Sequence, residues 1–317
     1  MQKVFLAPVA VALCLAATLA QAAGFRFIEV PADAAGPALN GAMWSPCAAP
    51  PGQIGLGDII VPGVKDCPIS GDKLPLVVIS HGAGGSYKDL QDTAETLANA
   101  GFVVVAVDHP DGRRDLVVRL VERPMDSKRL IDLVLGASPA ASRIDPQRIG
   151  FDGFSLGGYT GLVLLGANPD WAAARAYCQP YHLCDQLNGK QFPTEPLAHD
   201  ARIRAAVLAD PGPIFFDRDS FATVNAPIQL WASEGGGPRE RVDFVNRSLP
   251  AEHEYHVVPN SRFGALGGHF AFVLCPPALV EKRPEVCSDH PGFDRAVFHK
   301  EFNAAVLAFF QEHLIDR

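Results

Sequence analysis

Short apolar runs rich in β-branched residues alternate with amphipathic segments along most of this chain. Residues 76–80 and 102–107 carry no charge and are bounded by Pro or Gly, which predicts strands buried on both faces. Residues 87–99 repeat apolar positions at helical spacing and stop before Gly101, which predicts a helix. By the same criteria we expect further strands at 25–30, 41–44, 149–153, 205–209, 228–232 and 254–258, and further helices at 126–135, 156–165 and 298–314.

This order predicts one α/β domain. Strands that alternate with helices form βαβ units, whose right-handed crossovers give a mostly parallel, doubly wound sheet with helices on both faces. We expect 25–30 and 41–44 to open the sheet as an antiparallel pair. Asp126 is the expected N-cap of the helix at 126–135, and Asp108 is expected to cap the turn before Pro110.

Residues 168–199 interrupt the alternation. This segment is rich in Pro, Gln and Tyr and contains two cysteines. It is too long for a plain connection between a helix and a strand, so we interpret it as a small cap or lid insertion over the functional site.

The N-terminus has the pattern of an export signal. Lys3 precedes an apolar run over 4–19, and Ala20-Gln21-Ala22 forms an A-x-A cleavage pattern. The run is short for a membrane span and contains Pro8. We therefore expect residues 1–22 to be a cleaved signal peptide, 23–317 to be the mature domain, and the protein to be periplasmic or secreted without a stable membrane anchor.

The cysteines fit an exported protein. One of the seven, Cys14, lies in the signal, and the other six form neighbouring couples along the chain. An even number in an exported chain favours disulfides. The simplest pairing is 47–67, 178–184 and 275–287, which would fix three short excursions, the last two beside the expected functional site. The absence of Cys-x-x-Cys with matching His spacing argues against zinc.

Charge narrows the possible partners. The formal net charge of −8 provides no basic face for nucleic acid. We expect neither a metal nor an organic cofactor, and the sequence does not determine the oligomeric state.

The segment with the clearest chemical signal is Gly153-Phe154-Ser155-Leu156-Gly157, which lies between a predicted strand and a predicted helix. A Gly-x-Ser-x-Gly turn in this context presents the serine hydroxyl as a nucleophile, and its glycines remove Cβ atoms that would clash. We assign Ser155 as the candidate nucleophile.

A second glycine-rich segment follows the strand at 76–80. His81-Gly82-Ala83-Gly84-Gly85 matches the loop that supplies oxyanion donors in serine hydrolases of this kind. We assign those donors to the backbone N–H groups of Ala83 and of Leu156, the residue after the nucleophile. No Gly-Lys-Ser/Thr follows the loop, which argues against a phosphate-binding loop.

A base and an acid are expected after the nucleophile in the chain. His269 follows the last predicted strand and is the candidate base. Two acids remain open from position alone: Asp210 follows the strand at 205–209, and Glu234 follows the strand at 228–232. Each would lie at the carboxyl edge of the sheet, where open α/β sheets place their ligands.

With these residues, the chain resembles the α/β-hydrolase superfamily over its whole mature length. More narrowly, Ser80-His81-Gly82-Ala83-Gly84-Gly85, Gly-Phe-Ser155-Leu-Gly-Gly and Gly-His269-Phe resemble bacterial dienelactone-hydrolase-like proteins and group II platelet-activating-factor acetylhydrolases. In the acetylhydrolases the acid follows the strand after the nucleophile helix, which favours Asp210. Dienelactone hydrolases use a cysteine nucleophile where this chain has Ser155, so the resemblance does not imply lactone hydrolysis.

These residues and the resemblance imply an exported serine hydrolase that cleaves small or lipid-like carboxylic esters through Ser155, His269 and Asp210. A serine peptidase or acyltransferase on the same triad is the alternative among enzymes. A binding protein that kept the fold without activity is the alternative outside enzymes.

Overall fold

The computed structural model describes residues 22–316 except 58, 113–114, 173–190, 213–214, 237–238, 251–252, 264–270 and 283. The strands are β1 (Ala22–Val30), β2 (Leu39–Cys47), β3 (Gln53–Leu56), β4 (Ile59–Pro62), β5 (Val64–Lys65), β6 (Leu74–Ser80), β7 (Val103–Val107), β8 (Ile144–Phe154), β9 (Ile203–Ala209), β10 (Ile228–Gly236) and β11 (His253–Phe263). The helices are α1 (Gln91–Asn99), α2 (Leu116–Gly136), α3 (Leu156–Leu164), α6 (Arg239–Ser248), α7 (Pro277–Lys282), α8 (Pro284–Cys287) and α9 (Arg295–Leu314). Two 3₁₀ turns cover Ala141–Arg143 and Asp219–Phe221.

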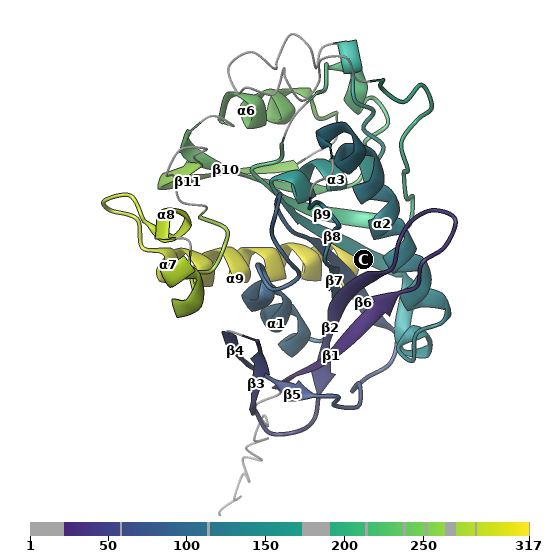
Figure 1. Ribbon diagram of the computed structural model, residues 1–317, viewed down its shortest axis with the longest axis vertical. Coiled ribbons are helices and arrows are strands. Elements are labelled where there is room, and N and C mark those ends of the chain that lie inside the picture. Colours follow the sequence, from purple (N-terminus) through teal and green to yellow (C-terminus); the bar gives the residue numbers. More distant parts are fainter. Residues whose placement is uncertain are drawn as a thin grey trace, which may run out of the picture.

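One twisted nine-stranded sheet organises the chain, in the order β11-β10-β9-β8-β6-β7-β2-β1-β5 (Figure 1). The six strands from β11 to β7 are parallel, β2 pairs antiparallel with both β7 and β1, and β5 adds a short parallel edge. The expected mostly parallel sheet with an antiparallel opening pair is therefore confirmed.

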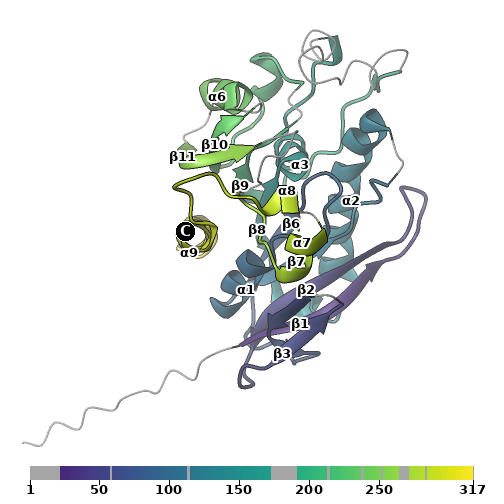
Figure 2. The same ribbon diagram turned by 60° about the vertical axis from the view of Figure 1, so that its left-hand side comes forward.

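Helices cover both faces of the sheet, with α1 and α9 on one side and α2 and α3 on the other (Figure 2). The strand side chains alternate between the two layers, as the pleat requires. In β6, Leu76 and Val78 pack in the core under α2 and α3, while Val77 and Ile79 pack in the core under α1 and α9. Burial on both faces explains why this strand is a continuous apolar run in the sequence.

The expected elements lie close to their predicted positions, with one clear error. The helix expected at 126–135 begins ten residues earlier, at Leu116, and its N-cap is Asp115, whose side chain accepts a hydrogen bond from the Val117 N–H at 2.9 Å. Asp126 is therefore not a cap. It is a buried residue in the middle of α2, where its carboxylate contacts His109 and Arg129.

Smaller differences concern ends and short elements. The helix predicted from residue 87 starts at Gln91, and the β3–β4 hairpin and helices α6, α7 and α8 were not predicted. Asp108 accepts a hydrogen bond from the Tyr87 N–H at 2.8 Å, so it ties the segment that leads into the preceding helix, α1, to the end of β7.

Two of the three predicted disulfides are confirmed. Cys47 is bonded to Cys67, and Cys275 is bonded to Cys287. The predicted pair 178–184 and most of the expected cap insertion at 168–199 lie outside the described residues. Within the described part of the chain, no helix combines the length and apolar character that a membrane span needs.

Candidate active site

The turn between β8 and α3 holds Ser155 in a backbone conformation that few non-glycine residues adopt. Its φ is 54° and its ψ is −113°. Such conformations cost about 1–3 kcal/mol and cluster at functional sites. The Ser155 hydroxyl does not cap α3, although serine is a favoured N-cap residue, so the side chain is not used to stabilise the helix that it precedes.

Glycines around Ser155 are required by close backbone approaches. A Cβ on Gly153 would lie 2.4 Å from the Gly157 carbonyl oxygen, and a Cβ on Gly157 would lie 1.9 Å from the Ser80 carbonyl oxygen. Both distances are far below van der Waals contact. Gly157 therefore lets the turn pack directly on the end of β6, where the glycine loop begins.

The glycine loop, residues 81–85, lies beside the turn. A Cβ on Gly82 would lie 3.5 Å from the Ser155 Cβ. In the described part of the chain, no group accepts a hydrogen bond from the N–H of Ala83 or of Leu156, the two expected oxyanion donors. Ala83 is exposed, whereas Leu156 is buried at the first position of α3, where a helix leaves its N–H unpaired.

Asp210 follows β9, the strand next to β8, and is 1% exposed. Two backbone hydrogen bonds join its neighbours to Ser155: the Ser155 N–H donates to the Ala209 carbonyl at 2.9 Å, and the Gly212 N–H donates to the Ser155 carbonyl at 3.0 Å. Asp210 also has a positive φ, of 42°. The turns that carry Ser155 and Asp210 are thus fixed to each other at the carboxyl edge of the sheet.

The Asp210 carboxylate is held by Ser233, the residue before Glu234 in β10. Its Oδ1 accepts from the Ser233 N–H at 2.8 Å, and its Oδ2 accepts from the Ser233 hydroxyl at 2.5 Å. Burial raises the pKa of Asp210 to about 6, although the two bonds from Ser233 oppose this increase.

The alternative acid, Glu234, has a different environment. It is exposed, and its Oε2 accepts a hydrogen bond from the Asn260 N–H at 2.8 Å in the adjacent strand. The side chain therefore connects β10 to β11 at the surface, whereas Asp210 lies in the interior next to the Ser155 turn.

The candidate base, His269, lies outside the described residues. The segment that follows it is well anchored: the Ala271 carbonyl accepts a hydrogen bond from His299 Nε2 at 2.9 Å, and His299 Nδ1 pairs with Asp92 at 2.7 Å. Ala271, two residues after His269 in the chain, is therefore fixed in the core.

Besides Asp210, Asp152 is a buried acid near the site; it lies in β8, three residues before Ser155. Burial, followed by the charge of Asp92, raises its pKa to about 7. Its Oδ2 has no hydrogen-bond partner among the described residues. Asp152 packs within the sheet rather than following the end of a strand, so we do not assign it to the site.

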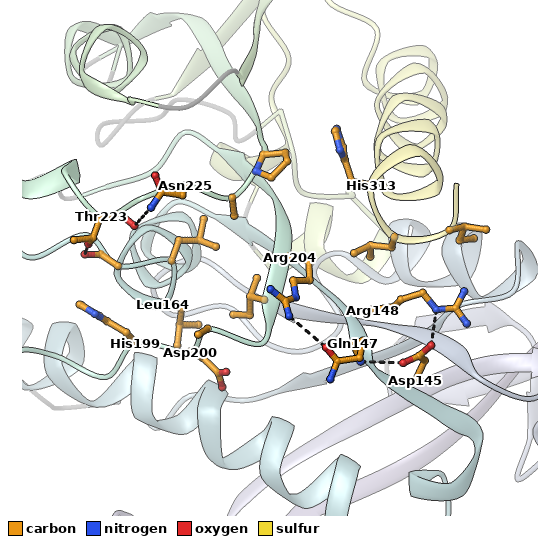
Figure 3. A pocket seen from close by; sticks show the side chains of 18 residues that line it. Asp145, Gln147, Arg148, Leu164, His199, Asp200, Arg204, Thr223, Asn225 and His313 are labelled. Carbon is orange, nitrogen blue, oxygen red and sulfur yellow. Dashed lines mark hydrogen bonds and ion pairs between the residues drawn. The ribbon is translucent and has the colours of Figure 1, made fainter. Parts of the chain in front are cut away.

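A cavity of about 950 Å³ lies elsewhere, at the amino ends of β8, β9 and β10 (Figure 3). Arg148, Arg204 and His199 line it together with His313 at the end of α9. Since parallel strands place their amino and carboxyl ends at opposite edges, this cavity is separate from Ser155 and Asp210. In the described part of the chain, no group of His, Cys, Asp and Glu side chains is suited to hold a metal ion.

Three residues at the site were not predicted: His109, Asp111 and Arg123. Arg123 is 1% exposed and contacts the carbonyl oxygens of the glycine loop. A signal for it exists in the sequence, because Arg123 shares the helical spacing of Leu116, Leu120 and Leu130 and so lies on the buried face of α2.

The sheet order, the strained serine turn and the helices on both faces define the α/β-hydrolase fold. A ferulic acid esterase from Streptomyces cinnamoneus has the same fold, with a TM-score of 0.64 at 20% identity over 95% of this chain and 92% of that one.

The sequence itself is similar to known ester hydrolases. The profile of the family "Platelet-activating factor acetylhydrolase, isoform II" matches residues 52–133. Cutinase 2 of Thermobifida cellulosilytica is 31% identical over 146 residues, which is 44% of this chain and 52% of that protein. Cutinase est1 of Thermobifida alba is 28% identical over 206 residues, 63% of this chain and 64% of that protein. The chain thus matches about half the length of the first of these relatives, and its resemblance to the α/β-hydrolase superfamily and to the acetylhydrolases is confirmed.

Proposed function

We propose that this protein is an exported serine hydrolase that cleaves carboxylic esters through an acyl-enzyme intermediate. The observation that carries the proposal is the Ser155 turn: a strained serine whose hydroxyl does not cap its helix, beside two backbone N–H groups that have no partner among the described residues. The similarity to proteins named cutinase, ferulic acid esterase and platelet-activating factor acetylhydrolase supports esters as the substrate class.

In the proposed mechanism Ser155 Oγ attacks the ester carbonyl carbon and His269 accepts the hydroxyl proton. The carbonyl oxygen becomes an oxyanion that accepts hydrogen bonds from the Ala83 and Leu156 N–H groups. Collapse of this intermediate expels the alcohol, protonated by His269, and leaves an acyl group on Ser155. Water, activated by His269, then attacks the acyl group, releases the acid and restores Ser155.

Asp210 is the proposed acid of the triad. Its carboxylate would accept a hydrogen bond from the His269 ring, fix the tautomer that can accept the Ser155 proton, and stabilise the imidazolium that forms. Burial supports this role, because a charge interaction in a water-poor site is stronger than one at the surface. No step requires a metal or an organic cofactor.

Export is part of the proposal. Disulfides persist in oxidising compartments, and Cys47–Cys67 and Cys275–Cys287 are consistent with a periplasmic or secreted protein from which residues 1–22 are removed after Ala22. We propose that residues 168–199 form a cap beside the site in the mature domain, 23–317.

Hydrolysis of p-nitrophenyl esters from acetate to palmitate tests the function and measures the preferred acyl length. We expect turnover by the wild-type protein at some chain length, with no requirement for added metal. Activity only toward peptide substrates would support a peptidase, and acyl transfer to an added alcohol in preference to water would support an acyltransferase. Absence of turnover on every substrate would support a binding protein.

A further inference from the structure

A buried arginine lies directly behind the glycine loop. Arg123 in α2 donates from Nη1 to the His81 carbonyl at 2.6 Å and from Nη2 to the Gly82 carbonyl at 3.1 Å. The Gly82 carbonyl also accepts from His81 Nδ1 at 2.6 Å and from the Gly85 N–H at 3.2 Å. Three donors therefore hold this one carbonyl on the side of the loop that faces α2.

The orientation of the Gly82 carbonyl determines the direction of the Ala83 N–H. Both groups belong to one planar peptide unit, and in a trans peptide they point in opposite directions. A carbonyl held toward Arg123 therefore directs the Ala83 N–H away from α2. This N–H is the proposed oxyanion donor, and Arg123 thus acts on it through a single rigid peptide plane.

Asp111 holds the next peptide from the same side. Its Oδ1 accepts from Arg123 Nε at 3.0 Å, and its Oδ2 pairs with Arg123 Nη2 and accepts from the Gly84 N–H at 3.2 Å. The peptide before Ala83 and the peptide after it are thus both bonded to one ion pair. Burial by itself would raise the pKa of Asp111, but the hydrogen bonds and charge of Arg123 outweigh it, and the net pKa is below the usual value. The pair is therefore ionised at neutral pH.

The two histidines of this cluster are neutral and have defined tautomers. His81 Nε2 accepts from the His109 N–H at 3.1 Å, so the proton of His81 is on Nδ1 and is donated to the Gly82 carbonyl. His109 Nδ1 donates to the Asp126 carboxylate at 3.2 Å, so its Nε2 accepts from the Ser80 hydroxyl at 3.0 Å. Burial, followed by the charge of Arg123, lowers the pKa of both rings well below the usual range.

Stability alone is a weak reason for this arrangement. A buried ion pair costs much desolvation energy, and well-packed apolar side chains of similar volume often stabilise a protein as well or better. Here the Arg123 donors go to Asp111 and to two loop carbonyls, with both flanks of Ala83 fixed. We infer that Arg123, oriented by Asp111, is a positioning residue that aims the Ala83 N–H at the oxyanion of the bound ester.

This inference rests on the proposed ester hydrolysis and assigns to Arg123 and Asp111 a role in transition-state stabilisation without contact with the substrate. It predicts that disturbing the pair lowers kcat more than it weakens substrate binding. The oxyanion forms only during the reaction, so a misdirected donor affects the transition state and leaves the ground state nearly unchanged.

The decisive variant is Arg123→Lys, which keeps the positive charge but has three donors on one nitrogen and cannot replace the four hydrogen bonds that Arg123 makes from three nitrogens. Removal of one oxyanion donor typically costs about 10²–10³ in kcat, and we expect a loss of about 10² with KM changed less than about threefold. The inhibition constant of a trifluoromethyl ketone, which forms an anionic hemiketal with Ser155, should rise by the factor by which kcat/KM falls.

Arg202→Lys is the matched control. Arg202 is another arginine in ion pairs, with Asp200 and with Asp132 of α2, but it lies just before β9 at the edge of the sheet opposite Ser155. It should lower the melting temperature without changing kcat per folded molecule. Burst titration of active sites in each variant separates a loss of functional molecules from a slower reaction.

If Arg123→Lys does not fold, Asp111→Asn takes its place. The amide keeps the shape of Asp111 but loses the charge that orients Arg123, and we expect kcat to fall about tenfold with the same inhibitor response. Wild-type kcat and wild-type ketone affinity in a folded Arg123→Lys or Asp111→Asn protein would overturn the inference. Absence of ester turnover in the wild-type protein would instead overturn the proposed function, so the two failures are distinguishable.

Discussion

Asp210 and Ser233 form a two-point contact in which the backbone N–H and the hydroxyl of Ser233 both donate to one buried carboxylate, at 2.8 and 2.5 Å. The two residues are 23 positions apart in the sequence, and they meet because β9 and β10 are neighbours in the sheet. The contact stabilises the ionised form of Asp210 against the burial that raises its pKa to about 6. It therefore keeps the proposed triad acid available as an anion at neutral pH.

Ser233→Ala tests this contact through the pH dependence of kcat/KM. The proposed mechanism requires ionised Asp210 and neutral His269, so we expect kcat/KM to fall on the acid side of neutrality, as a single limb. Loss of the hydroxyl removes a group that lowers the Asp210 pKa, so the acid limb should move upward by about one pH unit.

Ser261→Ala is the control for that shift. Ser261 is another buried serine at this sheet edge, and its hydroxyl donates to the Val258 carbonyl and accepts from the Glu234 N–H, with no contact to Asp210. Removal of the Ser261 hydroxyl should lower the stability of the protein and leave the acid limb of the kcat/KM profile at the wild-type pH. An equal shift in both variants, or no shift in Ser233→Ala, would show that the contact does not control the titration.

The choice of triad acid is tested by Asp210→Asn and Glu234→Gln. Asp210→Asn should reduce kcat by about 10⁴, as the loss of a triad carboxylate does, because the base then adopts the wrong tautomer. Glu234→Gln should change kcat less than twofold, since Glu234 is exposed and bonds the Asn260 backbone. Steady-state hydrolysis by the two purified variants measures both kcat values. A large loss in Glu234→Gln with little change in Asp210→Asn would make Glu234 the acid.

Asp152→Asn should change the pH dependence of stability in a known direction. In the folded protein Asp152 keeps its proton to about pH 7, whereas the unfolded chain loses it near pH 4. Between these values the native state binds more protons, so the stability that Asp152 contributes falls by about 1.4 kcal/mol per pH unit as the pH rises. Asp152→Asn avoids that loss. In urea unfolding, the free energy of unfolding of the variant should therefore rise relative to that of the wild type from pH 4 to pH 7.

Asp145→Asn, on the same strand, should change the pH dependence of stability in the opposite direction. The hydrogen bond from the Gln147 N–H is the largest cause of a pKa of Asp145 below its usual value; burial opposes it, and the Arg148 side chain lowers the pKa further. The contribution of Asp145 is therefore present above pH 4 and is lost on acidification, so this variant should be less stable than the wild type at neutral pH. A stability difference for Asp152→Asn that does not depend on pH would contradict the assignment of a buried, protonated Asp152.

Gly157→Ala should disrupt the serine turn. The added Cβ would lie 1.9 Å from the Ser80 carbonyl oxygen, so either the turn or the end of β6 must move. We expect a loss of about 3 kcal/mol or more in the free energy of unfolding, together with loss of ester turnover. Gly136→Ala is the control: it lies at the end of α2 with nothing within 4 Å of the added Cβ, and it should be neutral or slightly stabilising. A stable, active Gly157→Ala protein would mean that the turn and the glycine loop are not packed as described.

The sequence predicted the features that contiguous residues determine. Apolar runs such as 76–80 and 102–107 become β6 and β7 because burial on both faces leaves no position for a charge. The Ser155 turn and the glycine loop were predicted for the same reason, since each is a short local pattern with its own backbone requirement.

Features that depend on tertiary contacts were missed. Aspartate is a favoured residue type at helix N-caps, but the Asp126 carboxylate contacts His109 and Arg129 inside the core. The helix also continues through Pro124 instead of starting after it. The cluster joins Arg123 to Asp111, 12 residues away in the chain, and to His81, 42 residues away, and no single segment has a pattern that identifies it. The short helices α7 and α8 are too brief to show a helical period.

The central claim is that Ser155 is the nucleophile, and covalent labelling tests it most directly. The wild-type protein should react with a fluorophosphonate probe, gain the mass of one probe less HF as Ser155 Oγ displaces fluoride, and show the adduct on the peptide that contains Ser155. Ser155→Ala should lose both the adduct and at least about 10³-fold of p-nitrophenyl ester turnover, while Ser138→Ala, at a serine beyond α2, should keep both. A folded Ser155→Ala protein that still takes up the probe or still hydrolyses the ester would contradict the account.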